Sequence, residues 1–285
     1  MRRGFVCSFL FALAAAPSFA GYASRDLVLP VAGHATGSDG RAFETELWLT
    51  NTAPETTTLT LTFFTNGKNI ALPHRSSLQL QPNETRFLPT LNNDILGVPA
   101  AIGALRIEST TPLIADAQLA SRLATEPAAR AVATSFSAIP RQFAIGTGQS
   151  TLLHGVTLHD PYRYRLYAAE ITGQPLLFAV ALLDANGKEL ARRQLYVNAW
   201  EQLAASIDDE MTGVKGTPAV LQISGVNGAG RIALVGLRTA SDSHDATAFE
   251  MSFTTEPRNR VPWWEAFVYI AAAAAIIFVV VLRKR

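Results

Sequence analysis

The sequence predicts a mainly β protein made of two tandem antiparallel β-sandwich units plus one C-terminal transmembrane helix. Three observations lead to this prediction. Apolar and polar residues alternate along many short segments, part of the middle of the chain is repeated, and both ends of the chain are strongly apolar. The chain has 285 residues, and its two apolar ends contribute strongly to a hydrophobic content of 48%.

The first 20 residues have the parts of a secretory signal peptide. Arg2 and Arg3 form a basic start, residues 4–16 are an apolar run, and small residues precede an expected cleavage site after Ala20. A retained N-terminal anchor is the alternative. The single cysteine, Cys7, lies in this segment, so the exported chain is expected to have neither disulfides nor thiolate metal ligands.

The first β-sandwich unit is expected over residues 28–140. Its clearest strands are AFETELWLTN (residues 42–51) and TTTLTLTFF (residues 56–64), in which apolar residues recur at every second position. This alternation places apolar residues on one face of a strand and the rest on the other. The second face of AFETELWLTN carries three candidate binding residues: Glu44, Glu46 and Trp48. They indicate either a sugar-binding or calcium-binding surface or an ordinary solvated strand face.

The middle of the chain contains a duplication. FFTNGKNI (residues 63–70) and LLDANGKEL (residues 182–190) each lead an apolar run into an Asn-Gly turn, which is a common hairpin signal. The stretches that follow these turns also align, with Asn83 facing Asn198. The repeat therefore predicts two homologous units in tandem.

The second unit is expected over residues 150–255, after a linker of Gly and polar residues at 141–150. Its strand PYRYRLYAAE places Tyr162, Tyr164 and Leu166 on one face. The opposite face holds three further candidate binding residues: Arg163, Arg165 and Tyr167. This face would dock an acidic partner or the first unit, or it is a charged outer strand face.

Two segments at equivalent places in the repeat are expected to form single helical turns. These are LNNDILG (residues 91–97) and SIDDEMTG (residues 206–213). Each has acidic residues early and a glycine at the end, which favours a short helix at both of its termini.

Three stretches of the first unit together resemble a known type of domain: ETELWLTNTAPETTTLTLTFF, LQPNETRFLP and GALRIESTTPLIADAQLASR. This is the repeated immunoglobulin-like β-sandwich domain of secreted bacterial proteins, and the resemblance is clearest over residues 43–121. The second unit resembles it less, because it lacks the Trp and the Glu-Thr-Arg. The resemblance implies a fold and an exported location, and it implies no activity.

The sequence shows no motif that predicts catalysis. The five histidines lack HExxH or similar metal-binding spacing, no GxSxG is present, and GHATGSDG lacks Walker spacing and its lysine. We therefore expect no catalytic residue, no metal site and no cofactor, and a protein that is not an enzyme.

The C-terminal segment, residues 263–282, contains one charge, Glu265, and predicts a transmembrane helix. Tryptophans suit the headgroup boundary and a terminal basic cluster favours the cytoplasmic side, which a three-residue tail at 283–285 would occupy. The residues expected at the membrane interface are Trp263, Trp264, Arg283, Lys284 and Arg285. The alternative is that this helix is a sorting signal that is cleaved.

These features predict an exported protein with a binding or structural role at the bacterial cell envelope. It would be a single-pass protein of the cytoplasmic membrane, with its bulk in the periplasm or outside. The expected partners are the lipid bilayer and, in addition, other envelope proteins or glycans. The mildly acidic exported part and its location argue against nucleic acid. An envelope hydrolase is the other alternative.

Overall fold

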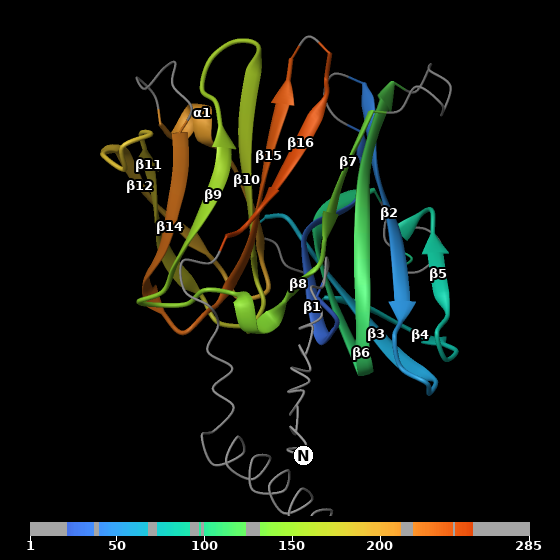
Figure 1. Cartoon of the computed structure of the whole chain (residues 1–285). Helices are drawn as coiled ribbons and strands as arrows, with labels where there is room; N and C mark the ends of the chain where they lie inside the picture. Colours follow the sequence, from blue (N-terminus) through green and yellow to red (C-terminus); the bar gives the residue numbers. More distant parts are fainter. Residues whose placement is uncertain are drawn as a thin grey trace, which may run out of the picture.

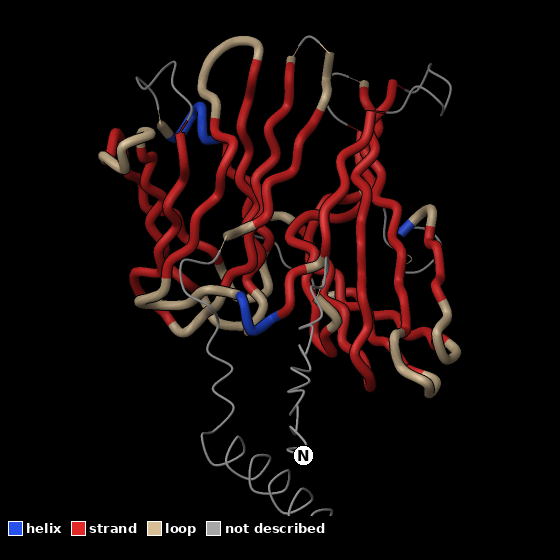
Figure 2. Tube along the Cα trace, viewed as in Figure 1, coloured by secondary structure: helices blue, strands red, loops and turns tan. Residues whose placement is uncertain are grey.

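The computed structural model describes residues 22–36, 40–67, 73–91, 97, 100–123, 132–211, 219–241 and 243–252. Antiparallel β-strands make up most of these residues, which confirms the mainly β prediction (Figure 2). Two short helical segments join them. These are a 3-10 turn at Arg141–Phe143 and helix α1 at Ile207–Glu210, which is the turn predicted in SIDDEMTG.

Several predicted features lie outside the described residues. They are the signal peptide, the transmembrane helix, the basic tail and the interface residues Trp263, Trp264, Arg283, Lys284 and Arg285, together with most of LNNDILG. Within the described ranges, no helix has both the length and the apolar character needed to cross a membrane.

The first half of the described chain, residues 22–140, forms one eight-stranded sheet that folds back on itself. Its strands are β1 (Ser24–Thr36), β2 (Arg41–Asn51), β3 (Thr57–Thr65), β4 (His74–Leu80), β5 (Thr85–Leu88), β6 (Ala101–Leu123), β7 (Val132–Ser137) and β8 (Ile139–Pro140). Strand β6 is continuous over 23 residues. Its first part pairs with β3 and β1 and its last part with β2 and β7, so one strand contributes to both layers of the sheet.

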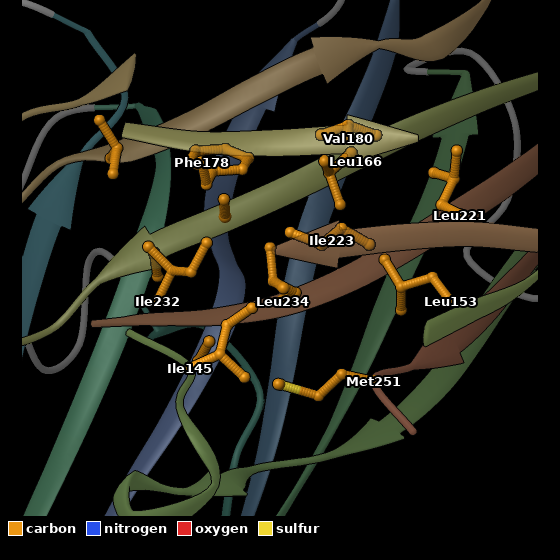
Figure 3. Close-up of a cluster of buried hydrophobic side chains, with 14 of the residues drawn as sticks. Ile145, Leu153, Leu166, Phe178, Val180, Leu221, Ile223, Ile232, Leu234 and Met251 are labelled. Carbon is orange, nitrogen blue, oxygen red and sulfur yellow. The ribbon is translucent and has the colours of Figure 1, made fainter. Parts of the chain in front are cut away.

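The second half, residues 150–252, forms two four-stranded sheets, with orders β13-β10-β15-β16 and β12-β11-β14-β9. Its strands are β9 (Ser150–Val156), β10 (Tyr162–Glu170), β11 (Leu176–Leu183), β12 (Glu189–Val197), β13 (Gln202–Ser206), β14 (Ala219–Gly228), β15 (Ile232–Ala240) and β16 (Ala246–Glu250). The sheets enclose an apolar core. Figure 3 shows Leu166 and Leu234 of one sheet facing Phe178 and Ile223 of the other.

The two halves have the same strand pairing. In the first half β3 pairs with β4 and β6, and β2 pairs with β5 and β6; in the second half β11 pairs with β12 and β14, and β10 pairs with β13 and β15. The difference is that β14 and β15 are separate strands, whereas β6 is unbroken. Two sheets stacked in this way bury the face on which apolar residues alternate.

One detail of the sequence alignment is wrong. Asn83 and Trp200 both adopt a left-handed backbone, with φ of 58° and 55°. Glu84 and Glu201, which follow them, each accept an equivalent backbone hydrogen bond of 2.9 Å, from Asn51 and Glu170. Asn83 therefore corresponds to Trp200 and not to Asn198. The two turns share a backbone conformation at positions 83 and 200 but carry different residues there, so matching the two asparagines gave the wrong alignment.

The two halves pack directly against each other (Figure 1). Val235 and Leu237 of β15 join the apolar core of the first half, and Val28 and Phe64 join that of the second half. Strand β1 is buried on both faces from Leu27 to Gly33 because it lies between these two cores.

The predicted linker is part of this packing. Phe143 and Ile145 are buried in the core of the second half, and Gly148 and Gln149 exchange backbone hydrogen bonds with Gly225 of β14. The predicted linker is therefore packed and hydrogen-bonded to the second half, because its apolar residues enter the core.

Both ends of the described chain lie at one groove. Tyr22 and Met251 line a cavity of about 200 Å³ together with Phe143. The rings of Tyr22 and Phe143 meet edge to face at 4.9 Å.

Candidate functional site

The candidate site is a cavity of about 580 Å³ between the two halves. The first half contributes the inner-face residues at the ends of β1, β2, β6 and β7. The second half contributes the outward face of β10, β13 and β15, with α1 and the turn between β15 and β16. Strands β10 and β15 lie beside the first half (Figure 1), and Tyr167, Val235 and Leu237 of these strands pack on its core next to the cavity.

Three arginines line the cavity: Arg41, Arg163 and Arg165. Arg41 starts β2 on the same strand face as Phe43 and Thr45, so it points inward and is only 9% exposed. Arg163 forms an ion pair of 3.0 Å with Asp160. Within the part of the chain that the structure describes, Arg165 has no hydrogen bond or ion pair through its side chain. The guanidinium of Arg165 is thus available to a ligand.

Asp208 and Asp209 bring negative charge to the same cavity from α1. The N–H of Tyr164 donates to Asp208 Oδ2 at 2.9 Å, which fixes the start of α1 against β10. The exposed Asp209 lies at the solvent side of the cavity wall. The acidic run seen in the sequence is therefore both a helix start, as predicted, and part of this wall.

Tyr164 is buried behind this wall. Its hydroxyl donates to the carbonyl of His154 at 3.0 Å, and burial raises the pKa of this phenol far above its usual range. Gly236 of β15 makes the position possible, because a Cβ atom there would lie 1.9 Å from the Tyr164 oxygen. Tyr164 is consequently a protonated hydrogen-bond donor with a structural role.

The inner wall of the cavity is mostly apolar and contains one polar group that stands out. Phe43 and Leu119 lie on the inner faces of β2 and β6, and Val31 and Leu237 lie nearby. Among these groups Ser121 is 9% exposed, and its hydroxyl has no hydrogen-bond partner among the described residues. A buried hydroxyl without a partner is costly, so this position favours a bound polar group.

The structure brings one group of predicted binding residues into this cavity. Arg163, Arg165 and Tyr167 all line it, and the ring of Tyr167 also packs on the core of the first half. Of the two partners considered for this face, the first half of the same chain is thus in contact. Arg163 and Arg165 lie next to this contact, on the wall of the cavity.

The other predicted group lies elsewhere. Glu44, Glu46 and Trp48 occupy the outer face of β2, opposite Arg41 and the cavity. Trp48 stacks on Phe87 of β5 at 4.7 Å between ring centroids. A carboxyl oxygen of Glu44 is 3.9 Å from His34 Nδ1. The two predicted groups therefore do not form one site.

Arg41 and Ser121 were not recognised from the sequence. The signal for Arg41 was present, since period-two alternation continued backwards from Phe43 places it on the inner face. Ser121 offered no such signal, because its importance depends on strands that meet only in the fold. Across the described residues, no group of three or more metal-ligating side chains comes together.

Comparisons with known proteins assign this chain to no family. No protein-family model matches the chain, and no curated protein matches it. Among solved structures, the crystal structure of Thermotoga maritima 1070 aligns with 42% of this chain and 96% of its own, at 17% identity and a TM-score of 0.34. Likeness at that level carries no argument about fold or function.

Proposed function

We propose that this protein is a binding protein of the bacterial cell envelope, which holds a small ligand in the cavity between its two halves. In this proposal the halves are homologous immunoglobulin-like β-sandwich units. The chain is exported by its N-terminal segment and held at the cytoplasmic membrane by the apolar segment at residues 263–282.

The observation that carries the proposal is the cavity itself. Its volume of about 580 Å³ falls within the roughly 300–1,000 Å³ typical of small-molecule sites. Apolar walls with a few polar groups at fixed positions are also typical of such sites. Here Arg165 and Ser121 are polar groups without partners among the described residues, and both line the cavity.

The envelope location is supported by sequence features. The basic and apolar start with its small-residue cleavage site is typical of an export signal. The apolar C-terminal stretch with its basic end is typical of a membrane anchor. A cavity that opens beside solvent-exposed groups such as Asp209 suits the capture of a ligand from the surrounding fluid.

Ligand-induced stabilisation tests this function. The full chain in lipid nanodiscs is heated with panels of small carboxylates, phosphates, amines and neutral sugars, and the melting temperature is read by differential scanning fluorimetry. We expect at least one class to raise it, because a ligand that binds only the folded state stabilises that state.

Two variants show whether the cavity is responsible. Ala204→Trp places an indole in the cavity wall and should abolish the rise. Thr58→Trp places the same ring on an exposed position of β3 and should leave the rise unchanged. If no class raises the melting temperature, or if Ala204→Trp responds like the native chain, the proposal is wrong.

A further inference from the structure

The charges that line the cavity select the charge of its ligand. Three arginines and two aspartates line it, so its formal charge is one positive unit when histidine is counted as neutral. Arg163 is already paired with Asp160, and Asp208 already accepts from the backbone of Tyr164. Of the two arginines that β10 contributes, Arg165 is the one without an ion pair among the described residues, and a ligand with a single negative charge complements it.

On the inner wall of the cavity, Arg41 and Ser121 lie next to each other on one face of the sheet. Phe43 and Ser121 are direct partners in the pairing of β2 with β6, and Arg41 precedes Phe43 by two residues. Arg41 and Ser121 are therefore diagonal neighbours on the same inner face. An acid group that accepts from the Ser121 hydroxyl would therefore also lie near the positive charge of an arginine.

The rest of the wall suits a hydrocarbon body. Val31, Phe43, Leu119 and Leu237 present apolar side chains to the cavity. A hydrophilic anion such as inorganic phosphate would leave these surfaces against water, whereas an alkyl or aryl body would bury them favourably. The same wall is part of the apolar core of the first half, so its position is fixed before any ligand arrives.

We infer that the ligand is an amphipathic monocarboxylate, whose carboxylate is bound by Arg165 and Ser121 and whose apolar body lies along the inner wall. This inference rests on the proposed function and deepens it, since it names the class of molecule that the cavity binds. Ser121 is buried, and its hydrogen bond to a carboxylate would be stronger than in water because the surroundings are less polar.

The test compares three molecules that share one alkyl body and differ only in the head group: octanoate, octan-1-ol and octylamine. Each is titrated calorimetrically into the full chain in nanodiscs, with empty nanodiscs as the reference for partition into lipid. We expect octanoate to bind at least about tenfold more tightly than octan-1-ol, since a hydrogen bond to a charged group is the stronger kind. Octylamine should bind most weakly because its ammonium group would be repelled by the arginines that line the cavity.

Variants then locate the carboxylate. Arg165→Ala and Ser121→Ala should each weaken octanoate several-fold and leave octan-1-ol unchanged. Arg193→Ala removes an arginine of β12 that does not line the cavity and whose side chain donates to the neighbouring Arg192 carbonyl, and it should change neither. Circular dichroism and the melting temperature of each variant show that it is folded.

The outcomes separate the two proposals. If octan-1-ol or octylamine binds as tightly as octanoate, or if Arg165→Ala and Ser121→Ala both leave octanoate binding intact, the inference is wrong. If octanoate does not bind but another class stabilises the native chain and not Ala204→Trp, the inference fails and the proposed function stands. If no class binds in the cavity, both fail.

Discussion

Single buried side chains hold the equivalent turns of the two halves, and they use different chemistry to do so. Asn51 is fully buried, donates from Nδ2 to the carbonyls of Glu55 and Gln81, and accepts from the N–H of Ala53. Glu170 occupies the equivalent place and is also fully buried. Its carboxyl oxygens accept from the backbone N–H groups of the surrounding loops and from the Thr172 hydroxyl, so the loops around it are arranged as donors.

Replacing Glu170 should therefore be severe. The N–H groups of Thr172, Gly173 and Trp200 donate to its carboxyl at 2.7, 2.8 and 3.0 Å. Glu170→Ala leaves these donors without an acceptor, and each such loss costs about 1–3 kcal/mol. We expect the free energy of unfolding, measured by urea denaturation, to fall by about 3 kcal/mol or more.

The matched control is Glu46→Ala, on the outer face of β2, where the carboxyl has no partner among the residues the structure describes. It should change the free energy of unfolding by less than about 0.5 kcal/mol. Similar losses for the two variants would contradict the role given to Glu170.

At the scale of the strand, β1 changes partner along its length. It pairs with β6 as far as His34 and with β2 from His34 onward. Gly33 lies at this change, with φ of 129° and its N–H donating to Thr45 Oγ1 at 2.9 Å. A glycine is needed here because the chain must turn from one layer of the sheet into the other.

Gly33→Ala should therefore lower the free energy of unfolding by more than backbone strain alone would. A Cβ atom at Gly33 would lie 2.1 Å from the carbonyl oxygen of Ala101, whereas Gly40, with φ of 79°, has open space around the equivalent atom. Gly40→Ala should cost about 1 kcal/mol and Gly33→Ala at least about 2 kcal/mol more. Urea denaturation of both variants measures the difference, and equal costs would show that the close approach to Ala101 is not maintained.

Strand faces could be predicted from the sequence, whereas strand partners could not. Which face Phe43 or Tyr164 occupies depends on local alternation, and both lie on the buried face that the alternation predicts. The partners of β6 are separated from it by many residues, and no local pattern shows that one strand runs through both layers. The cavity depends on these distant pairings, so sequence alone indicated Arg163 and Arg165 but not the inner wall that faces them.

At the scale of the molecule, the two halves form one packed body. Gln202 of β13 is fully buried, and its Nε2 donates to the carbonyls of Pro30 and Gly103 in the first half, both at 3.2 Å. Elsewhere in the contact, Ala248 N–H donates to Thr134 Oγ1 and Ser137 N–H donates to a carboxyl oxygen of Glu250. Neither half completes its core without the other.

The chain should consequently unfold in one calorimetric transition. Gln202→Ala removes the donor for two buried carbonyls and should lower the free energy of unfolding by about 1–3 kcal/mol while the transition stays single. Gln79→Ala, at an exposed position of β4, should have little effect. Two separate transitions, with only one of them moved by Gln202→Ala, would show that the halves are independent.

The groove shared by Tyr22 and Met251 has a practical consequence for work with this protein. The turn between β15 and β16, which borders the cavity, lies at the far end of the strands from β8, which borders the groove (Figure 1). A capture tag joined directly at residue 22 or residue 252 would therefore attach on the side away from the cavity. On a biosensor chip both orientations of attachment leave the entrance free, so a difference in signal between the two formats would report on the tag and not on the site.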